Sequence, residues 1–351
     1  MKPKKKVRIA ITMGDPAGIG PEITLRALCD KKIANSASFV ILGDYGVATQ
    51  LQRELRLPFN FHIISDIGRM NMSEEMINFL NLGNVTFPIP YGKVDARCGK
   101  AAYEYINMGC LLLRSGTLNG LVTAPICKEA LHLAGYPVQG HTQILAQRFN
   151  ARYVRMMFVA GKVRVVLVTV HVPLAAVPGL ITKKAVQDTI FSVSRDITTY
   201  FKIKRPRIAV CGLNPHASEG GLFGTEEKEH IIPAIAKARQ QKIKVEGPFP
   251  ADSLFWQAKD GAYDAIIAMY HDQACIPFKT LYFDKGVNVS LGLPFVRTSP
   301  DHGTAFNIVG THHADPSSMK EAIKLCVEMS ANVPRKRKKI KVYVPNQDRF
   351  R

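Results

Sequence analysis

The fold class is decided by residues 163 to 211, which begin Val163-Arg-Val-Val-Leu-Val-Thr-Val170 and end Pro206-Arg-Ile-Ala-Val-Cys211. Both ends are short apolar runs rich in β-branched residues, which predicts two strands. The segment after Thr182 has the pattern of an amphipathic helix, with one apolar stripe made of Val186, Ile190, Val193, Ile197 and Phe201. A strand, a helix and a second strand in this order are typical of an α/β protein with a largely parallel sheet.

The same alternation extends over most of the chain. Further strands are expected at Arg8–Met13, Ser38–Leu42, Gly120–Thr123 and Ala265–Met269. A helix is expected from Pro21 to Cys29, because proline is tolerated at the first helical position. Two more helix starts are predicted from capping patterns, Thr225 before Glu226 and Glu227, and the capping box Ser318-x-x-Glu321.

No linker interrupts residues 8–334, so a second domain should be an interleaved lobe rather than a separate domain joined through a linker. We therefore expect one catalytic unit over residues 1–334, made of two interleaved α/β lobes, and a basic tail over 335–351.

Composition excludes several classes of protein. An apolar fraction of 46% and a charged fraction of 21% indicate a globular chain rather than a disordered one. No apolar run approaches the roughly 18 residues that a membrane helix needs. The seven cysteines form no C-x-x-C pair, so we expect reduced thiols and a cytoplasmic protein.

The formal net charge of +19 suggests nucleic acid as a partner, but the charge is concentrated at the ends. Residues 1–8 contribute +5 and residues 335–351 contribute +7, which leaves +7 for the body. A moderately basic body suits an enzyme that attracts anionic substrates. We therefore expect a small phosphorylated substrate and no membrane partner, and we interpret the two basic ends as solvated tails rather than as a nucleic-acid site.

Three of the expected strands are each followed by a histidine, namely His171, His216 and His271. Ligands of open α/β sheets collect beyond the carboxyl ends of the strands, so the three imidazoles should approach one crevice or share one across a dimer. Each histidine alone could be a hydrogen-bonded structural residue. Together they predict a catalytic divalent metal, since three protein ligands leave open positions. Spacings of 45 and 55 residues exclude a local zinc finger.

Basic residues follow the third histidine. Lys279 and Arg297 flank Asn288 in a glycine- and proline-punctuated segment, which suits a phosphate or carboxylate clamp; two solvent-facing cations are the alternative. Gly140-His141-Thr142 opens a helical segment that could also bind an anion. The glycine-rich turn Met13–Glu22 departs from G-x-G-x-x-G, so it is weak evidence for a nucleotide site.

From about residue 8 to residue 330 the chain resembles the 4-hydroxythreonine-4-phosphate dehydrogenase family of vitamin B6 biosynthesis. The matching segments occur in the family's order and are Thr12-Met-Gly-Asp-Pro-Ala-Gly-Ile-Gly-Pro-Glu22, Thr123-Ala-Pro-Ile-Cys-Lys128, Gly140-His-Thr142, His171-Val-Pro-Leu174, Asn214-Pro-His216, Gly247-Pro-Phe-Pro-Ala-Asp252, Tyr270-His-Asp-Gln273 and Arg297-Thr-Ser-Pro-Asp-His-Gly-Thr-Ala305.

The resemblance implies two interleaved α/β lobes of the isocitrate and isopropylmalate dehydrogenase type, with the active site in the cleft between them. It implies that His171, His216 and His271 bind a divalent metal, zinc or alternatively magnesium, cobalt or manganese. His271 would come from the second subunit of a homodimer. Substrate contacts are implied for His141, Thr142, Lys279, Asn288 and Arg297.

The same resemblance implies NAD or NADP as cofactor, bound by the loop Asp301-His302-Gly303-Thr304-Ala305. This loop is similar to the adenine-side loop of the isocitrate and isopropylmalate dehydrogenases. Asp252, Asp272 and Lys279 are candidates for catalytic proton handling, although either aspartate could instead be a helix cap or a salt-bridge partner.

The implied reaction is NAD(P)-dependent oxidation of 4-phosphohydroxy-L-threonine at C3, followed by decarboxylation to 3-amino-2-oxopropyl phosphate. The metal would bind the substrate hydroxyl and amine. Gln143 stands where the family pattern has glutamate, which keeps phosphorylated erythronate or threonate open as substrates. A metal-dependent sugar-phosphate hydrolase or aldolase would use the same histidines and clamp without a nicotinamide.

Overall fold

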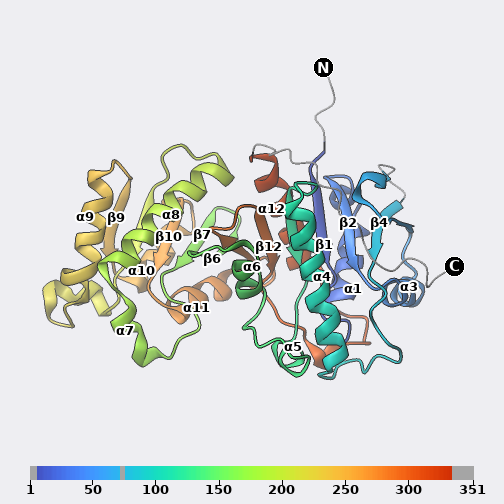
Figure 1. The fold of residues 1–351 in the computed structure, drawn as a ribbon. Coiled ribbons are helices and arrows are strands. Elements are labelled where there is room, and N and C mark those ends of the chain that lie inside the picture. The colour runs from blue at the N-terminus through green and yellow to red at the C-terminus, as the bar shows by residue number, and fades with distance from the viewer. Residues whose placement is uncertain (1–5, 72–75, 334–351) are drawn as a thin grey trace, which may run out of the picture. The chain divides into compact units, whose positions relative to one another are not determined.

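The computed structural model describes residues 6–71 and 76–333. The chain divides into two compact units (Figure 1). Unit 1 comprises Met1–Arg152 and Leu293–Arg351, and unit 2 comprises Tyr153–Gly292. Unit 2 is therefore an insertion into the sequence of unit 1, and each unit is described by itself. The basic ends, residues 1–5 and 335–351, lie outside the described residues.

Unit 1 alternates strands with helices. Its strands are β1 (Arg8–Thr12), β2 (Ser38–Gly43), β3 (Asn60–Ile63), β4 (Met76–Asn81), β5 (Gly120–Thr123) and β12 (Val296–Pro300). Its helices are α1 (Gly20–Leu28), α2 (Lys31–Ala34), α3 (Tyr45–Glu54), α4 (Ala96–Arg114), α5 (Lys128–Leu133), α6 (His141–Phe149) and α12 (Ser317–Ala331). Two 3₁₀ turns, Ile67–Arg69 and Phe306–Ile308, complete it.

The strands of unit 1 follow the order β3-β4-β2-β1-β5-β12, and the pairs between them are parallel. α4 packs against β1, β2 and β5, while α12 packs against β5 and β12 (Figure 1). β1, β2 and β5 are almost wholly buried and rich in apolar residues, as expected of parallel strands covered on both faces.

Unit 2 has the strands β6 (Arg155–Ala160), β7 (Val163–Leu167), β8 (Ile208–Cys211), β9 (Val245–Phe249), β10 (Ala265–Ala268) and β11 (Val287–Leu291). Its α-helices are α7 (Val177–Leu180), α8 (Lys183–Phe201), α9 (Ile232–Gln240), α10 (Ala251–Ala258) and α11 (His271–Tyr282). Shorter helical turns are η2 (Leu174–Ala176), η3 (Pro215–Gly221) and the π-helical turn η4 (Glu227–Ile231).

The strands of unit 2 follow the order β11-β6-β7-β10-β8-β9. β7, β10, β8 and β9 pair in parallel, whereas β6 pairs antiparallel with both β7 and β11. The α/β fold class is confirmed, and so are the six expected strands, each within two or three residues of its predicted ends. The predicted helix after Thr182 is α8, and the Thr182 hydroxyl accepts the N–H of Ala185 at 3.1 Å.

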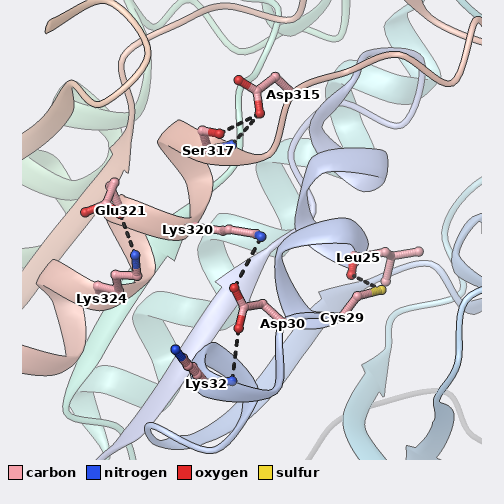
Figure 2. A network of polar contacts seen from close by, with 9 residues as sticks. All are labelled: Leu25, Cys29, Asp30, Lys32, Asp315, Ser317, Lys320, Glu321 and Lys324. Atoms are coloured by element: carbon pink, nitrogen blue, oxygen red, sulfur yellow. Dashed lines mark hydrogen bonds and ion pairs between the residues drawn. The ribbon is translucent and has the colours of Figure 1, made fainter.

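The predicted capping box at Ser318 is wrong. Helix α12 begins one residue earlier, and Figure 2 shows Asp315 accepting both the backbone N–H and the hydroxyl of Ser317, at 2.9 and 2.7 Å. Glu321 pairs with Lys324 instead of folding back. Ser318 is buried and accepts the N–H of Asp301 at 3.2 Å, a contact between distant segments that local spacing cannot reveal.

The predicted helix start after Thr225 is confirmed, since η4 begins two residues later with Glu227 and Glu229 in its first turn, but the predicted side-chain cap is wrong. The turn that follows is η4, a π-helical turn without a side-chain cap. Glu227 does not sit in a solvated first turn, since it is only 1% exposed and hydrogen-bonds to another segment. In the described residues no helix combines the length and apolar character that crossing a membrane would require. All seven cysteines are free thiols, as expected.

Candidate active site

The three predicted histidines follow three neighbouring strands of unit 2. β10 lies between β7 and β8 and pairs with both in parallel. His171 follows β7, His271 follows β10 as the first residue of α11, and His216 follows β8 within η3. Neighbouring parallel strands end at the same edge of a sheet, so this topology collects the three segments at one edge.

His171 and His271 lie side by side, with ring centroids 5.8 Å apart. Both line a pocket of about 220 Å³, together with Thr169, Tyr270 and Asp272. Asp272 Oδ1 lies 2.6 Å from Nδ1 of His271, and Cys275 Sγ lies 3.5 Å from Nε2. A carboxylate on one imidazole nitrogen fixes the ring orientation and raises the basicity of the other nitrogen, as ligating histidines require.

His216 lies in an unusual left-handed turn. Residues 216 to 220 all have positive φ, at 52°, 52°, 64°, 43° and 73°. Non-glycine residues adopt this conformation at a cost of about 1–2 kcal/mol each, so the surroundings must hold it. Glu227 does so: its carboxylate accepts the N–H of Leu213 at 2.7 Å and that of Asn214 at 2.8 Å, and the side-chain amide of Asn214 donates at 3.0 Å.

One chain does not assemble the whole set of predicted metal ligands. Within residues 6–71 and 76–333, no three histidine, cysteine, aspartate or glutamate side chains gather in a metal-binding arrangement. The ring of His216 packs on Phe223, at a centroid distance of 6.4 Å. Two adjacent imidazoles would fit part of the coordination shell of a divalent metal such as zinc or cobalt, but the described residues of one chain do not complete that shell.

Unit 1 contains a buried cationic site. Arg297 on β12 is 3% exposed and donates to Thr123 Oγ1 of β5 from Nε at 3.1 Å and from Nη2 at 2.7 Å. Burial lowers the pKa of Arg297 to about 10, which still leaves it charged near neutral pH. Burial, and next the charge of Arg297, hold the pKa of His141 well below its usual value, so a neutral imidazole lies near a guanidinium.

This part of unit 1 has hydrogen-bonding capacity left for a ligand. Nε2 of His141, on the first residue of α6, is buried without a hydrogen-bond partner among the described residues. Thr142 follows it on the same helix. Gln143 turns back, and its side-chain oxygen accepts the N–H of Gln139 at 2.6 Å.

The remaining predicted substrate and catalytic residues belong to unit 2. Lys279 lies in the last turn of α11, and Asn288 on β11 has a buried Oδ1 without a partner in the described part of the chain. Asp252 lies in the first turn of α10, and its Oδ1 accepts the N–H of Ser253 at 2.9 Å; the N-cap of α10 is Pro250, so Asp252 is not the helix cap.

The predicted nucleotide loop lies against the glycine-rich turn of unit 1. The N–H of Ile19 donates to the carbonyl of Thr304 at 3.0 Å. A Cβ on Gly18 would lie 3.0 Å from the Cβ of Thr304, a tighter contact than most side chains make, so glycine suits this close approach. His302 Nε2 is buried without a partner among the described residues.

The model of the family described as pyridoxal phosphate biosynthetic protein PdxA matches residues 35–326. The chain belongs to the PdxA family. A 4-hydroxythreonine-4-phosphate dehydrogenase of Geobacter metallireducens is 43% identical over 93% of this chain and 97% of its own length. A D-threonate 4-phosphate dehydrogenase of Cupriavidus necator is 41% identical over 92% of this chain and 97% of its own. The crystal structure of a 4-hydroxythreonine-4-phosphate dehydrogenase from Klebsiella pneumoniae superposes with a TM-score of 0.84, at 37% identity, over 93% of this chain and 100% of that one.

Three residues of this PdxA-family chain escaped the prediction of site residues. Thr123 and Asp15 lie in motifs shared with the family, and Glu227 lies in a predicted helix start, but the local sequence gives none of the three a role in a site. Burial raises the pKa of Asp15 from 3.8 to about 6, although the N–H of Ala17 donates to its Oδ1 at 2.9 Å. Their importance depends on burial, which the motifs alone do not specify.

Proposed function

We propose that the chain oxidises 4-phosphohydroxy-L-threonine at C3 with NAD or NADP, and that the product loses CO₂ to give 3-amino-2-oxopropyl phosphate. The observation that carries this proposal is the 43% identity to a 4-hydroxythreonine-4-phosphate dehydrogenase over nearly the whole length of both chains. The reaction would belong to vitamin B6 biosynthesis in the cytoplasm, a compartment that suits seven free thiols.

Arg297 and His141 provide the recognition of anionic groups. A guanidinium donates two parallel hydrogen bonds to a carboxylate or phosphate, and Thr123 holds that of Arg297 in one orientation. The depressed pKa of His141 keeps its imidazole neutral, so that it offers one N–H donor or one acceptor rather than a second charge. In our proposal Thr142, Lys279 and Asn288 complete the substrate contacts.

His171, His216 and His271 would hold a divalent metal, with zinc as the first candidate and magnesium, cobalt or manganese as alternatives. When bound, such an ion lowers the pKa of a coordinated hydroxyl and polarises the ketone that oxidation forms. Asp272 holds the His271 imidazole in place, and we propose that Asp252, Asp272 or Lys279 moves the hydroxyl proton.

The metal site would be shared between two copies of the chain. Each histidine segment carries large apolar side chains exposed to solvent: Val172 and Leu174 after His171, Leu222 and Phe223 after His216, and Ile276 and Leu281 on α11 after His271. Of the sixteen exposed large apolar residues in the described chain, eleven belong to unit 2. Contiguous exposed apolar surface is typical of protein interfaces. A dimer through unit 2 would cover these residues, and we propose that His271 of one copy joins His171 and His216 of the other copy in the metal site.

D-Threonate 4-phosphate is the second candidate substrate. The specific observation in its favour is the residue at position 143. The side-chain oxygen of Gln143 accepts the N–H of Gln139, as a glutamate oxygen could, but Gln143 adds no negative charge. A carboxylate there would favour the ammonium group that 4-phosphohydroxy-L-threonine has and threonate phosphate lacks. The nucleotide would occupy the loop Asp301–Ala305 with either substrate.

The deciding experiment follows NAD(P)H absorbance with purified protein, either dinucleotide, and each of the two substrates, before and after chelation and metal re-addition. We expect faster turnover of 4-phosphohydroxy-L-threonine, its loss on chelation and its recovery with a divalent ion. Faster turnover of D-threonate 4-phosphate would establish the second candidate. Turnover of neither would reject both and favour a hydrolase or aldolase.

A further inference from the structure

Unit 1 contains a second pocket that the proposed substrate contacts do not use. Its volume is about 230 Å³, and four segments line it: the glycine-rich turn, α3, the loop at Tyr91 and the loop after the Phe306–Ile308 turn. Ligand pockets for whole drug-sized molecules usually measure about 300–1,000 Å³, so this one suits a fragment such as a nucleoside. We infer that it takes the adenosine half of the dinucleotide and selects NAD over NADP, an inference that rests on the proposed function.

The position of the pocket connects it with the predicted nucleotide loop. Val309, Gly310 and His312 of its lining follow Asp301–Ala305 in the sequence, separated from it by the short Phe306–Ile308 turn. The lining also includes Pro16 and Gly18, and the neighbouring Ile19 donates its N–H to the carbonyl of Thr304 of the same loop. A nucleotide held at Asp301–Ala305 can therefore extend into this pocket within unit 1.

The lining combines surfaces for a flat base with acceptors for hydroxyl groups. Leu51, Tyr91 and Val309 supply apolar and aromatic surface. Glu54 and Gln50 stand beside Tyr91: Gln50 Nε2 donates to Glu54 Oε1 at 2.8 Å, and the Tyr91 hydroxyl donates to Gln50 Oε1 at 3.3 Å. This chain of hydrogen bonds leaves the second oxygen of Glu54 for a hydroxyl donor.

The charges of the lining decide between the two dinucleotides. The described lining contains two glutamates and no lysine or arginine. The guanidinium of Arg26 lies outside this lining; it donates Nε to Glu22 Oε1 at 2.8 Å and Nη2 to the carbonyl of His312, so its charge is paired with one of the two glutamates. A carboxylate accepts the ribose 2′-hydroxyl of NAD, whereas the 2′-phosphate of NADP needs a cation there and is repelled by a carboxylate.

Calorimetric titration of the full-length protein with NAD⁺ and with NADP⁺ tests the inference without turnover. The informative variant is Glu54→Lys, and its matched control is Glu328→Lys, the same charge change at an exposed position of α12 outside the pocket. We expect the wild type to bind NAD⁺ at least tenfold more tightly than NADP⁺. Glu54→Lys should reduce that ratio at least tenfold, and Glu328→Lys should leave it within twofold.

A second variant, Val309→Trp, fills the pocket and should weaken both dinucleotides together, with thermal unfolding checked to show that the variant is folded. Equal or tighter binding of NADP⁺ by the wild type, equal responses of the two lysine variants, or unchanged binding by folded Val309→Trp would each overturn this inference alone. Binding of neither dinucleotide by the wild type would overturn it together with the proposed dehydrogenase reaction.

Discussion

The buried carboxylate of Glu227 accepts the backbone N–H of Asn214 at 2.8 Å, two residues before the predicted metal ligand His216. It also accepts the N–H of Leu213 and thereby anchors the left-handed turn that carries the histidine. Glu227→Gln keeps the size of the side chain but replaces an acceptor oxygen by a donor NH₂, so that two donors would face each other.

We expect Glu227→Gln to weaken the binding of Zn²⁺ or Co²⁺ by about 10- to 100-fold, the usual effect of losing an outer-shell partner. The measurement is metal titration by calorimetry. Glu229→Gln, an exposed neighbour, is the matched control and should bind metal as the wild type does. Unchanged metal affinity in a folded Glu227→Gln protein would show that the turn is held without this carboxylate.

The pH dependence of stability should reveal Asp15. Its pKa is raised to about 6 in the folded protein, so the folded state binds the proton more tightly than the unfolded state. The carboxyl group therefore supports folding fully below about pH 3.8, and this contribution is lost as the pH rises through about 6. The difference in pKa corresponds to roughly 3 kcal/mol at about 1.36 kcal/mol per unit.

Asp15→Asn should consequently gain stability relative to the wild type between pH 4 and pH 7, as measured by chemical denaturation at several pH values. Asp260→Asn, at a carboxylate that is 84% exposed, should show a flat difference over the same range. A difference for Asp15→Asn that is flat or falls with rising pH would argue against a buried, proton-binding Asp15.

Gln143→Glu tests what separates the two candidate substrates. The glutamate oxygen can still accept the N–H of Gln139, so the start of α6 should be preserved. The added negative charge should raise kcat/KM for 4-phosphohydroxy-L-threonine relative to D-threonate 4-phosphate by about fivefold, equivalent to roughly 1 kcal/mol for a partly exposed charge pair. Steady-state assays with both substrates measure this ratio, and an unchanged ratio would remove position 143 from substrate selection.

Sharing of the metal site can be tested by subunit complementation. His171→Ala and His271→Ala should each be inactive when purified alone. Co-expressed, they should recover about a quarter of wild-type activity, since about half of the dimers would be mixed and each would hold one intact site. No recovery, with mixed dimers shown to form by tandem affinity purification, would place both histidines in the site of one chain.

Much of the fold could be predicted from local patterns. β5 lies where apolar β-branched residues predicted it, and the stripe that ends at Phe201 is the helix α8. These elements are specified by side chains within a few residues of each other, because a strand repeats every two residues and a helix every 3.6. The positions of His171, His216 and His271 after three strands could be predicted for the same reason, because each depends only on the local sequence.

The strand order β7-β10-β8 could not be predicted from the sequence, because strand pairing depends on contacts between segments far apart along the chain. Two cap predictions were wrong for the same reason, since both side chains bond to distant segments. Ser318 accepts the N–H of Asp301, and Glu227 accepts those of Leu213 and Asn214.

The sequence by itself determined the α/β class, the strand-end histidines and the motifs of the PdxA family, all of which are local or ordered along the chain. Only the tertiary structure decided that Thr123 orients Arg297, 174 positions away, and that the half-buried His141 lies near that guanidinium. It also brought α3 and the loop after β12 together around one pocket. The physical reason is that burial and long-range hydrogen bonds arise from chain packing, which sets desolvation and charge at each site independently of the neighbours in sequence.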